Sequence, residues 1–335
     1  MQKGQNRFII AISIVFFLIT QTIIMASVPN HLERQKVNIV IANGTSLNGI
    51  SEILKQNGVI SSRYLFLLCS MLYGGRLIAG EYELSRDMST IEVVRKMGNG
   101  ERKIYVLRVI EGHNIYNIAE SIDKAGIMKA DEFLKIAKDP EFLISLGIKA
   151  DTIEGYLSPE TYFYSREIEP ERFIGIIAKK TLNLFEREDI KNRMTEMGLD
   201  VHSTLTIASM IEKEARLKDE KPLISAVFHN RLKRGMSLDC DPTIIYGTGR
   251  FATPITKKDI TTYTPYNTYR FKGLPRGPIC SPDYASIKAA LNPAQVDYLY
   301  FVSKNDGTHV FSKDMREHNR FVYLYQRAKK QKNHL

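Results

Sequence analysis

The 335-residue sequence contains no tryptophan and only three cysteines, Cys69, Cys240 and Cys280. Three cysteines cannot build a disulfide framework, although Cys240 and Cys280 could pair in an oxidising compartment. Cys69 lies in an apolar run and is expected to pack as a small hydrophobic residue. No CxxC or HExxH pattern occurs, so the sequence predicts no metal site and no cofactor. The aromatic residues that are present are 17 tyrosines and 15 phenylalanines.

The composition is that of a basic globular protein. Hydrophobic residues make up 44% of the chain, which is enough for a sizeable core, and the formal net charge is +10. The length allows one large unit or two to three smaller ones. A basic balance suits an anionic surface such as phospholipid headgroups, an acidic cell-wall polymer or nucleic acid. Composition alone does not choose between these partners.

The only long apolar run covers residues 8–26 and is interrupted by four polar residues. About 20 such residues span a bilayer as a helix. Lys3 and Arg7 precede the run, and positively charged flanks stay in the cytoplasm. A cleaved signal peptide is the alternative, but the run is longer than a usual signal core and no clean cleavage site follows it. We therefore predict that residues 1–30 form a cytoplasmic tail and a transmembrane anchor, with the rest of the chain exported.

The exported part begins with an internal repeat. Residues 37–59 and 105–127 align without gaps, and each reads as a strand, a turn at a glycine, and an amphipathic helix ended by a glycine. A second helix is predicted in each copy, over residues 64–72 and 130–137. This unit resembles a LysM module, which grips N-acetylated glycan chains; the alternative is a small packing unit without a ligand. We define residues 31–150 as the LysM-like region, with two degenerate repeats.

A predicted helix over residues 204–218 carries Glu214 in the middle of an apolar stripe. Successive helical residues turn by about 100°, which places isoleucine and methionine side chains around this glutamate. The opposite side of the helix carries Ser209, Lys213 and Arg216. A carboxyl among apolar side chains is costly to ionise, so its pKa rises, as a general acid near neutral pH requires. The helical wheel equally allows a glutamate that pairs with an Arg or Lys elsewhere, or one that reaches solvent.

Five motif-like clusters follow in the second half of the chain. They are IEGYLSPETY (153–162), ASMIEKE (208–214), VFHNRL (227–232) with GMSLDCDPT (235–243), YNTY (266–269) with GLPRGPI (273–279), and YLYFV (298–302) with HVF (309–311) and EHN (317–319). In this order, after an anchor and a LysM-like segment, they resemble the MltG (YceG-like) family of endolytic murein transglycosylases. The resemblance covers nearly the whole exported chain.

The resemblance implies a bitopic enzyme in which a LysM-like subdomain is joined to a catalytic domain, here residues 151–335. Members of the family cut the MurNAc–GlcNAc bond of nascent peptidoglycan strands internally and leave 1,6-anhydroMurNAc ends, which terminates strand elongation. The essential acid of the family is the second glutamate of the Glu-Lys-Glu cluster. That residue is Glu214 in this chain, the same residue that the helical wheel singles out.

The sequence departs from the family pattern at positions expected near the rim of the cleft. An aromatic residue is usual where Ser158 stands, Asp where Glu160 stands, Gln-Thr where Asp239-Cys240 stands, and Pro where Arg276 stands. These differences bear on fine specificity more than on the chemistry.

In the implied reaction Glu214 acts first as the acid and then as the base. Side chains with suitable donors, acceptors and stacking faces are expected to bind the substrate. They are Glu160, Asn230, Asp241, Tyr266, Asn267, Thr268 and Tyr269. Asp241 equally fits a turn before Pro242. His309 and His318 fit hydrogen bonds in the site or purely structural ones.

We therefore expect an α+β protein with an N-terminal transmembrane helix, a LysM-like subdomain and a mixed catalytic domain. The expected activity is that of a peptidoglycan lytic transglycosylase, a lyase, at the cytoplasmic (inner) membrane, with a single span, the N-terminus inside and the catalytic domain on the extracytoplasmic side. Expected partners are glycan strands and membrane-bound peptidoglycan synthases, and no nucleic acid. The alternatives are a membrane-anchored peptidoglycan-binding scaffold, or a hydrolytic muramidase that uses Glu214 with Asp241 and water.

Overall fold

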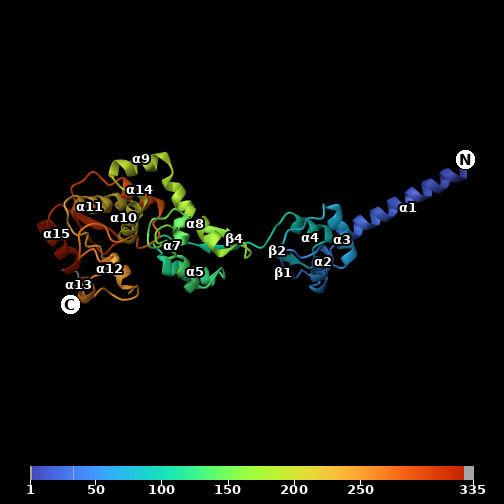
Figure 1. The fold of residues 1–335 in the computed structure, drawn as a ribbon, viewed down its shortest axis with the longest axis horizontal. Helices are drawn as coiled ribbons and strands as arrows, with labels where there is room; N and C mark the ends of the chain where they lie inside the picture. Colours follow the sequence, from blue (N-terminus) through green and yellow to red (C-terminus); the bar gives the residue numbers. More distant parts are fainter. Residues whose placement is uncertain (1, 33, 328–335) are drawn as a thin grey trace. The chain divides into compact units, whose positions relative to one another are not determined.

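The computed structural model describes residues 2–32 and 34–327, and the fold is mixed α+β, as predicted (Figure 1). Contacts divide the chain into two compact units. Unit 1 comprises Met1–Val106 and Phe163–Ile168, and unit 2 comprises Leu107–Tyr162 and Glu169–Leu335. The second predicted repeat therefore belongs mainly to unit 2, so the compact units and the predicted regions 31–150 and 151–335 divide the chain at different residues.

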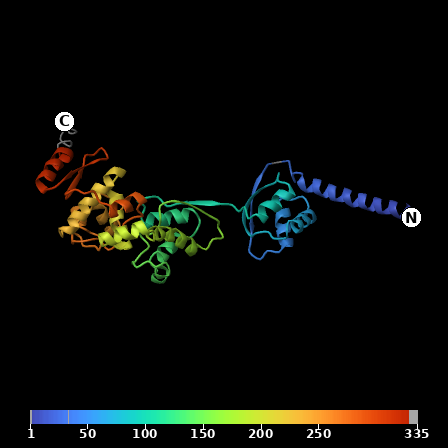
Figure 2. The ribbon, with the colours of Figure 1, turned by 90° about the horizontal axis from the view of Figure 1, so that it is seen from above.

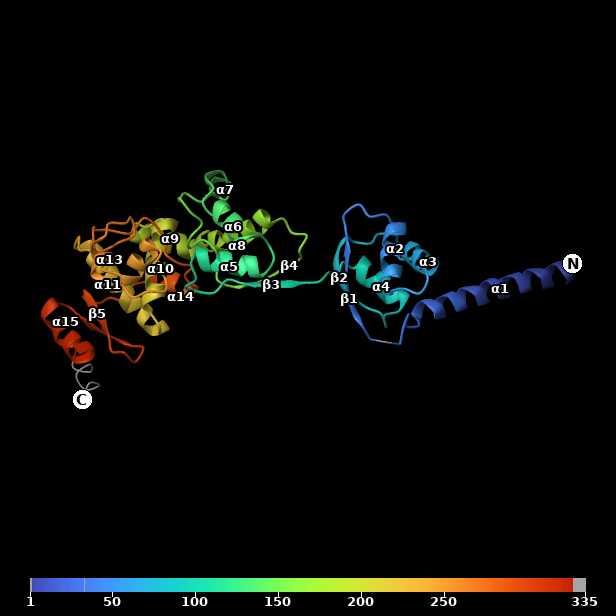
Figure 3. The same cartoon turned by 90° about the horizontal axis from the view of Figure 1, so that it is seen from below.

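Unit 1 is a two-stranded antiparallel ribbon covered by helices. Its elements are α1 (Gln2–Ser27), β1 (Lys36–Ile41), α2 (Leu47–Gln56), α3 (Arg63–Leu72), β2 (Gly80–Ser85) and α4 (Thr90–Gly98). The β1 and β2 strands pair from Lys36 opposite Ser85 to Ile41 opposite Gly80. Helices α2, α3 and α4 gather on one side of this ribbon (Figures 1 and 3). Their apolar faces and the inward side chains of the strands form one core that includes Ile39, Leu54, Phe66, Tyr82 and Val93.

Helix α1 is long, but its side chains are described only at residue 10 and from residue 12 onward. Over the residues that the structure describes, no helix meets the length and apolar character needed to cross a membrane.

Unit 2 is mostly helical. Its elements are α5 (Ile115–Lys124), α6 (Ala130–Ile136), α7 (Pro140–Ser145), α8 (Pro170–Phe185), α9 (Glu188–Met197), α10 (Val201–Glu214), η1 (Lys218–Glu220), α11 (Lys221–Lys233), α12 (Asp241–Thr248), α13 (Lys257–Thr261), α14 (Tyr284–Leu291), β5 (Tyr300–Ser303), β6 (His309–Ser312), α15 (Met315–Val322) and the π-helical turn η2 (Tyr323–Arg327). Strands β3 (Tyr105–Arg108) and β4 (Thr161–Tyr164) pair with each other. The boundary between the units falls within both strands.

Helix α10 is the central element of unit 2 and contacts α11, α12 and α14. Its residues from Thr204 to Ile211 are all buried, including Ser209, which the helical wheel placed on the polar side. The buried hydroxyls are satisfied by the helix itself, since Thr204 donates to the Asp200 carbonyl at 2.7 Å and Ser209 donates to the Thr206 carbonyl at 2.8 Å. A hydroxyl that is bonded in this way can be buried at little cost. The helix is therefore buried around its whole circumference and has no solvent face over these residues.

The two repeat copies adopt the predicted order of strand, helix and helix, in β1–α2–α3 and β3–α5–α6. The glycines that the sequence places at equivalent turns share the same backbone conformation. Gly44 and Gly112 have φ of 83° and 74°, and Gly58 and Gly126 have φ of 68° and 71°. Positive φ favours glycine because a side chain there is strained. The two copies of the sequence repeat thus share the same local backbone conformation at their turns.

The last part of the chain forms the hairpin β5–β6, which pairs Tyr300 with Ser312 and Ser303 with His309. Helix α15 packs on both strands of this hairpin. Figure 2 shows the hairpin and helix together in red at the edge of unit 2. Their inward faces contribute one wall of the cavity described below.

Candidate active site

Glu214 is the last residue of α10, four residues before the end that the sequence predicts for this helix. Ala215 is extended, with ψ of 119°, so the helix ends there and the Glu214 side chain emerges at the helix terminus. The side chain is partly exposed to a cavity of about 420 Å³. The other lining residues come from α11, the loop before α12 and its first residue, the segment between α13 and α14, and the β5–β6, α15 and η2 region. They include Arg231, Asp239, Asp241, Tyr269, Tyr300, Phe301, Ser303, His309, Met315, His318 and Gln326.

The carboxyl of Glu214 is a weak acid in this setting. Its pKa is raised to about 7: burial raises it most, the hydrogen bond from the Cys240 thiol lowers it, and the nearby negative charge of Asp241 raises it. Cys240 Sγ lies 3.3 Å from Glu214 Oε1. Desolvation and a like charge both disfavour the ionised carboxylate. Glu214 therefore carries a proton over much of the range in which an enzyme would need a general acid.

Asp241 and Tyr269 lie next to Glu214 and line the same cavity. The Tyr269 hydroxyl donates to Asp241 Oδ1 at 2.7 Å. Asp241 is the first residue of α12, just before Pro242 at the next helical position. A negative charge there faces the positive end of the helix dipole. The Tyr269 hydroxyl thus holds a second carboxylate, that of Asp241, in the cavity of Glu214. Asp241 and Tyr269 were both predicted as site residues.

Arg231 lines the same cavity and was not predicted as a site residue. It is 7% exposed, and its guanidinium donates to the Leu299 carbonyl at 2.7 Å and to Asp239 Oδ2 at 2.8 Å. The guanidinium also lies 4.9 Å from the centre of the Tyr300 ring. These contacts join α11 to the hairpin and to the loop before α12. The sequence signal for this residue was an arginine within the mostly apolar VFHNRL cluster. Such an arginine, if buried on a helix, needs hydrogen-bond partners from other segments of the chain.

The two histidines of the final clusters line the cavity. His309 Nδ1 lies 2.7 Å from Glu220 Oε2, and the His309 backbone N–H donates to Glu220 Oε1 at 2.8 Å. His318 stacks on Tyr300 with ring centres 5.1 Å apart. Burial and the Arg231 charge lower the pKa of His318, so its ring stays neutral near pH 7. His309 thus has a structural partner, and His318 presents a neutral ring at the wall.

Thr268 lies behind the site rather than in it. It is fully buried, and its Oγ1 accepts a hydrogen bond from the Cys240 backbone N–H at 3.0 Å. Because Cys240 contacts Glu214, Thr268 acts on the acid only through Cys240.

Four other predicted substrate-binding residues are not brought to the cavity of Glu214. Asn230 donates its amide to the carbonyls of Val296 and Tyr298 at 2.8 and 2.9 Å, and so ties α11 to the segment before β5. Asn267 is 1% exposed and donates to three backbone carbonyls that follow α13 or belong to it. Both amides are occupied within the fold, so they have no donor left for a ligand.

Glu160 and Tyr266 lie in other surroundings. Glu160 is exposed and forms an ion pair with Lys180 at a different cavity of about 480 Å³. Tyr266 packs edge-on against Tyr246 with ring centres 4.7 Å apart. Within the YNTY cluster, Tyr269 therefore lines the cavity of Glu214, and the other three residues stabilise the loop that carries it.

Glu154 is a second acid with a raised pKa; unlike Glu214 it is fully buried, and it does not line the cavity. Burial raises its pKa to about 7, against hydrogen bonds from the Ile115 N–H, the Tyr246 hydroxyl and the Gly155 N–H. The Ile115 N–H lies at the start of α5, 2.9 Å from Glu154 Oε2. This carboxyl satisfies a free N–H at a helix N-terminus, so its role is to attach α5 to the catalytic helices.

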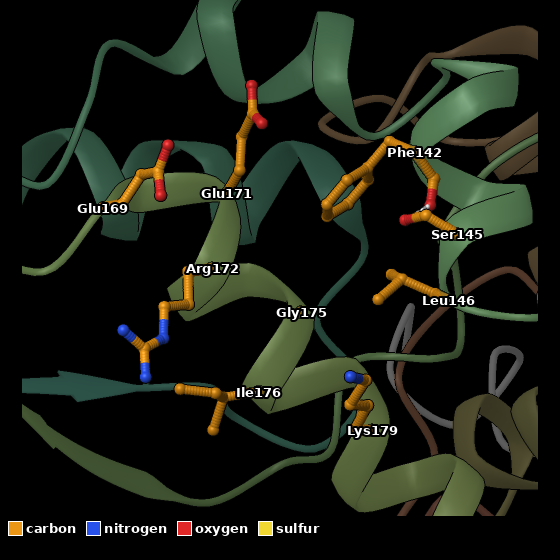
Figure 4. A pocket seen from close by; sticks show the side chains of 9 residues that line it. All are labelled: Phe142, Ser145, Leu146, Glu169, Glu171, Arg172, Gly175, Ile176 and Lys179. Atoms are coloured by element: carbon orange, nitrogen blue, oxygen red, sulfur yellow. Dashed lines mark hydrogen bonds between the residues drawn. The ribbon is translucent and has the colours of Figure 1, made fainter.

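Another pocket of about 420 Å³ lies between α7 and α8 (Figure 4). Phe142, Ser145 and Leu146 form one side, and Arg172, Ile176 and Lys179 project from α8 on the other. It shares no lining residue with the cavity of Glu214. Exposed charged side chains surround it, and no buried acid lines it, so it offers no general acid for catalysis.

All three cysteines are free. Cys69 packs at the edge of the core of unit 1, as expected for a small hydrophobic residue. Cys240 and Cys280 are buried, and they bond to Glu214 and to the Ser209 carbonyl respectively, so they do not pair with each other.

A partly exposed acid with a raised pKa, at a helix terminus and on the wall of a polar cavity, is typical of an enzyme that uses acid–base catalysis. The YceG-like family matches residues 39–323, and the chain belongs to that family. It is 35% identical over 314 residues to an endolytic murein transglycosylase of Bacillus subtilis (strain 168), covering 88% of this chain and 86% of the relative.

Two further comparisons agree. The chain is 28% identical over 323 residues to the endolytic murein transglycosylase of Streptococcus pneumoniae serotype 2 (strain D39), covering 86% of this chain but only 58% of that longer protein. A 2.6 Å crystal structure of a YceG-like protein from Listeria monocytogenes is 34% identical, covers 86% of this chain and all of that chain, and has a TM-score of 0.60.

Proposed function

We propose that this protein is an endolytic lytic transglycosylase that cleaves the MurNAc–GlcNAc bond of nascent peptidoglycan glycan strands. The observation that carries the proposal is the partly exposed Glu214 carboxyl at the end of α10, whose pKa burial raises to about 7, on the wall of a cavity of about 420 Å³. Membership of the YceG-like family and the names of the bacterial relatives support the substrate class.

The chemistry requires one carboxyl that works twice. Protonated Glu214 donates its proton to the oxygen that bridges the two sugars, and the bond from that oxygen to C1 of MurNAc breaks. The positive charge that forms at C1 is relieved by the N-acetyl group of the same sugar. The Glu214 carboxylate then takes the proton of the C6 hydroxyl, and the C6 oxygen closes onto C1. No water is consumed, and the product ends in 1,6-anhydroMurNAc.

The neighbours of Glu214 suit this sequence of steps. The carboxylate of Asp241, held by the Tyr269 hydroxyl, places negative charge beside the cation that develops at C1. Tyr269 lines the cavity and offers a ring face on which a sugar ring can pack. We therefore retain Asp241 and Tyr269 as substrate-contacting residues and assign Thr268 to the support of Cys240.

A hydrolytic muramidase is the second candidate, because Asp241 is a second carboxyl close enough to Glu214 to influence its pKa. A hydrolase uses such a pair, with one carboxyl as acid and the other as nucleophile or base. The products separate the two candidates, since hydrolysis adds one water to the MurNAc end and transglycosylation adds none.

We further propose that α1 is a single membrane anchor with the N-terminus in the cytoplasm and unit 2 on the other side, near the synthases that make the strands. Apolar side chains along α1 are largely exposed, among them Phe16, Phe17 and Met25 at 71, 61 and 62%. A helix of 26 residues is about 39 Å long, against about 30 Å for the hydrocarbon core of a bilayer. Exposed apolar surface of this extent is unfavourable in water and favourable in lipid.

The LysM-like region is proposed to bind N-acetylated glycan. The order β1–α2–α3–β2, with the two strands paired antiparallel, supports the likeness. In this proposal unit 1 binds the glycan strand and unit 2 cuts it.

The substitution Glu214→Gln tests the function. It should lower the rate of glycan cleavage by at least about 100-fold, because a general acid–base residue contributes about 10²- to 10⁴-fold. The full-length protein in detergent is incubated with isolated glycan strands, and mass spectrometry counts the anhydro and reducing ends.

Glu188→Gln is the matched control, since Glu188 is an exposed carboxyl at the start of α9 and should leave the rate unchanged. Full activity of a folded Glu214→Gln variant would refute the role of Glu214. Reducing ends in place of anhydro ends would refute the lyase and favour the muramidase.

A further inference from the structure

The thiol of Cys240 gives the carboxyl of Glu214 its hydrogen bond. Sγ lies 3.3 Å from Oε1, and among the described residues no other group donates to this carboxyl. Cys240 is 1% exposed, and it sits directly before the first residue of α12. The sulfur is therefore an enclosed part of the wall against which the Glu214 side chain rests.

Two threonines fix the backbone on either side of this sulfur. Thr243 Oγ1 donates to the Cys240 carbonyl at 2.6 Å, and Thr268 Oγ1 accepts from the Cys240 N–H at 3.0 Å. The two hydroxyl oxygens lie 2.9 Å apart. Since each hydroxyl has one hydrogen and that of Thr243 is used on the carbonyl, Thr268 donates to Thr243. Every donor in this buried cluster is thus assigned, and the position of Sγ is fixed by it.

The thiol is in the state that allows it to donate. Burial, together with the negative charge of Glu214, raises the pKa of Cys240 well above its usual value, so the group stays S–H. A neutral thiol is a weak donor and a poor nucleophile. This makes Cys240 a group that orients the carboxyl and argues against a reactive cysteine.

We propose that Cys240 is a positioning residue for the reaction: its S–H holds one oxygen of the Glu214 carboxyl and leaves the other oxygen to meet the sugar bridge. The proposal rests on the proposed function of Glu214. Oε2 has no hydrogen-bond partner among the described residues, and the side chain lines the cavity, so one face of the carboxyl is held and the other is available.

The choice of a thiol also affects how firmly the carboxyl keeps its proton. A hydrogen bond to a carboxylate stabilises the charged form, and a hydroxyl is a stronger donor than a thiol. A hydroxyl at this position would make Glu214 a stronger acid, and removal of the donor would make it a weaker one. With Asp241 nearby already disfavouring the charge, the weak donor keeps the acid protonated near neutral pH.

The test compares Cys240→Ser and Cys240→Ala in the full-length protein. If the S–H acts on Glu214, the fall of kcat/KM at high pH should occur at lower pH in the serine variant. In the alanine variant it should occur at higher pH. Each shift should be about half to one pH unit, as a hydrogen bond of about 0.5–1.5 kcal/mol implies. The alanine variant should also lose kcat, because the freed carboxyl spends less time in the reactive orientation.

Cys280→Ser is the matched control. Cys280 is an equally buried thiol, but its sulfur lies 3.4 Å from the Ser209 carbonyl and does not contact Glu214. If Cys240 had only a structural role, its substitution would lower stability without changing the pH at which kcat/KM falls. The proposal is therefore overturned if kcat/KM falls at the same pH in all folded variants. If the alanine variant does not fold, the serine variant alone carries the direction of the shift.

A second readout separates this proposal from the function. The titration of Glu214 can be followed by NMR of protein labelled with carbon-13 at glutamate carboxyls, with the signal assigned by its loss in Glu214→Gln. A shifted titration in an inactive enzyme would support the role of Cys240 and refute the proposed function. An active enzyme whose Glu214 titrates identically in the serine and alanine variants would refute the role of Cys240 and leave the function intact.

Discussion

Glu214 should make the activity fall as the pH rises through neutrality. Its pKa is raised to about 7, so the acid is protonated below that pH and ionised above it. Because the first step needs the proton, kcat/KM should be level below about pH 6 and fall about tenfold per pH unit above about pH 8. Initial rates of glycan cleavage across this range test it. A rate that rises across neutral pH would show that the ionised carboxylate starts the reaction.

The acid and two residues of its cavity, Asp241 and Tyr269, were predicted from the sequence, whereas Cys240 and Arg231 were not. Glu214 stands out because it follows isoleucine and methionine in a helical pattern and completes the Glu-Lys-Glu cluster. Cys240 and Asp241 approach it only because the loop before α12 folds back on the end of α10. Asn230 and Asn267 looked like ligand-binding amides, but their donors satisfy backbone carbonyls. Residue type reveals a capacity for hydrogen bonding, and only the fold decides which partner uses it.

Glu154, at the element scale, should make the stability of unit 2 fall with rising pH. Its pKa is near 7 in the folded protein and near 4.5 when unfolded, so the folded state holds more protons between these values. Stability is therefore greatest below about pH 4.5 and is lost up to about pH 7, by about 3 kcal/mol for this carboxyl.

Glu154→Gln should flatten that dependence, because an amide does not titrate. Urea denaturation at several pH values between about 5 and 8 measures it. Part of the slope should remain, since the pKa of Glu214 is raised in the same direction. The exposed substitution Glu188→Gln should leave the slope as it is. An unchanged slope in Glu154→Gln would mean that this carboxyl ionises freely in the folded protein.

A buried ion-pair network joins α10, α11 and the start of α14. Lys221 is 4% exposed, and its Nζ lies 3.0 Å from Glu212 Oε2 and 2.7 Å from Asp283 Oδ1. Lys221→Met should cost about 3–5 kcal/mol of unfolding free energy, because it leaves buried carboxylates without a cation. Lys124→Met, at an exposed pair with Glu120, should cost less than about 0.5 kcal/mol.

Denaturant titrations of both variants measure the difference. Adding Glu212→Gln to Lys221→Met should recover part of the loss, since one uncompensated charge is removed. A cost for Lys221→Met as small as that of the exposed pair would show that water reaches the network.

The elements of the repeats were predictable from glycines and apolar spacing, because positive φ and helical periodicity are local properties. The end of α10 was not. The pattern suggests a helix to residue 218, but the chain becomes extended at Ala215, where Glu212 is already committed to partners on α11 and near α14. A tertiary contact outweighs local helix propensity there. That early end is what places Glu214 at a helix terminus.

For the whole molecule, the short connection between α1 and β1 should influence the length of the glycan product. If α1 is the anchor, residues 28–35 confine the catalytic unit to a layer near the membrane. Inserting a flexible Gly/Ser linker of about 30 residues, which reaches about 30 Å on average, should change the length distribution of strands in cells. Chromatography of isolated strands measures it, with the same insertion carrying Glu214→Gln as the control. An unchanged distribution would show that the tether does not set the length.

The domain plan was only partly visible in the sequence. Two similar repeats suggested a single region over residues 31–150, but the packing places the first in unit 1 and most of the second in unit 2. The similarity of the two repeats predicts their local backbone conformation. The unit to which each copy belongs depends instead on the segments against which it packs. The second copy is held by Glu154 and by the pairing of the Gly112 N–H with the Ser281 carbonyl.

The division of the chain also limits how the protein can be engineered. Unit 1 includes residues 163–168 as well as the first 106, so the polypeptide passes between the units at three places: within β3, within β4 and after Ile168. A chimaera made with a single junction would take strand β3 from one parent and its partner β4 from the other. Exchanging unit 1 between relatives therefore calls for three matched junctions, and evolution faces the same requirement whenever it recombines these genes.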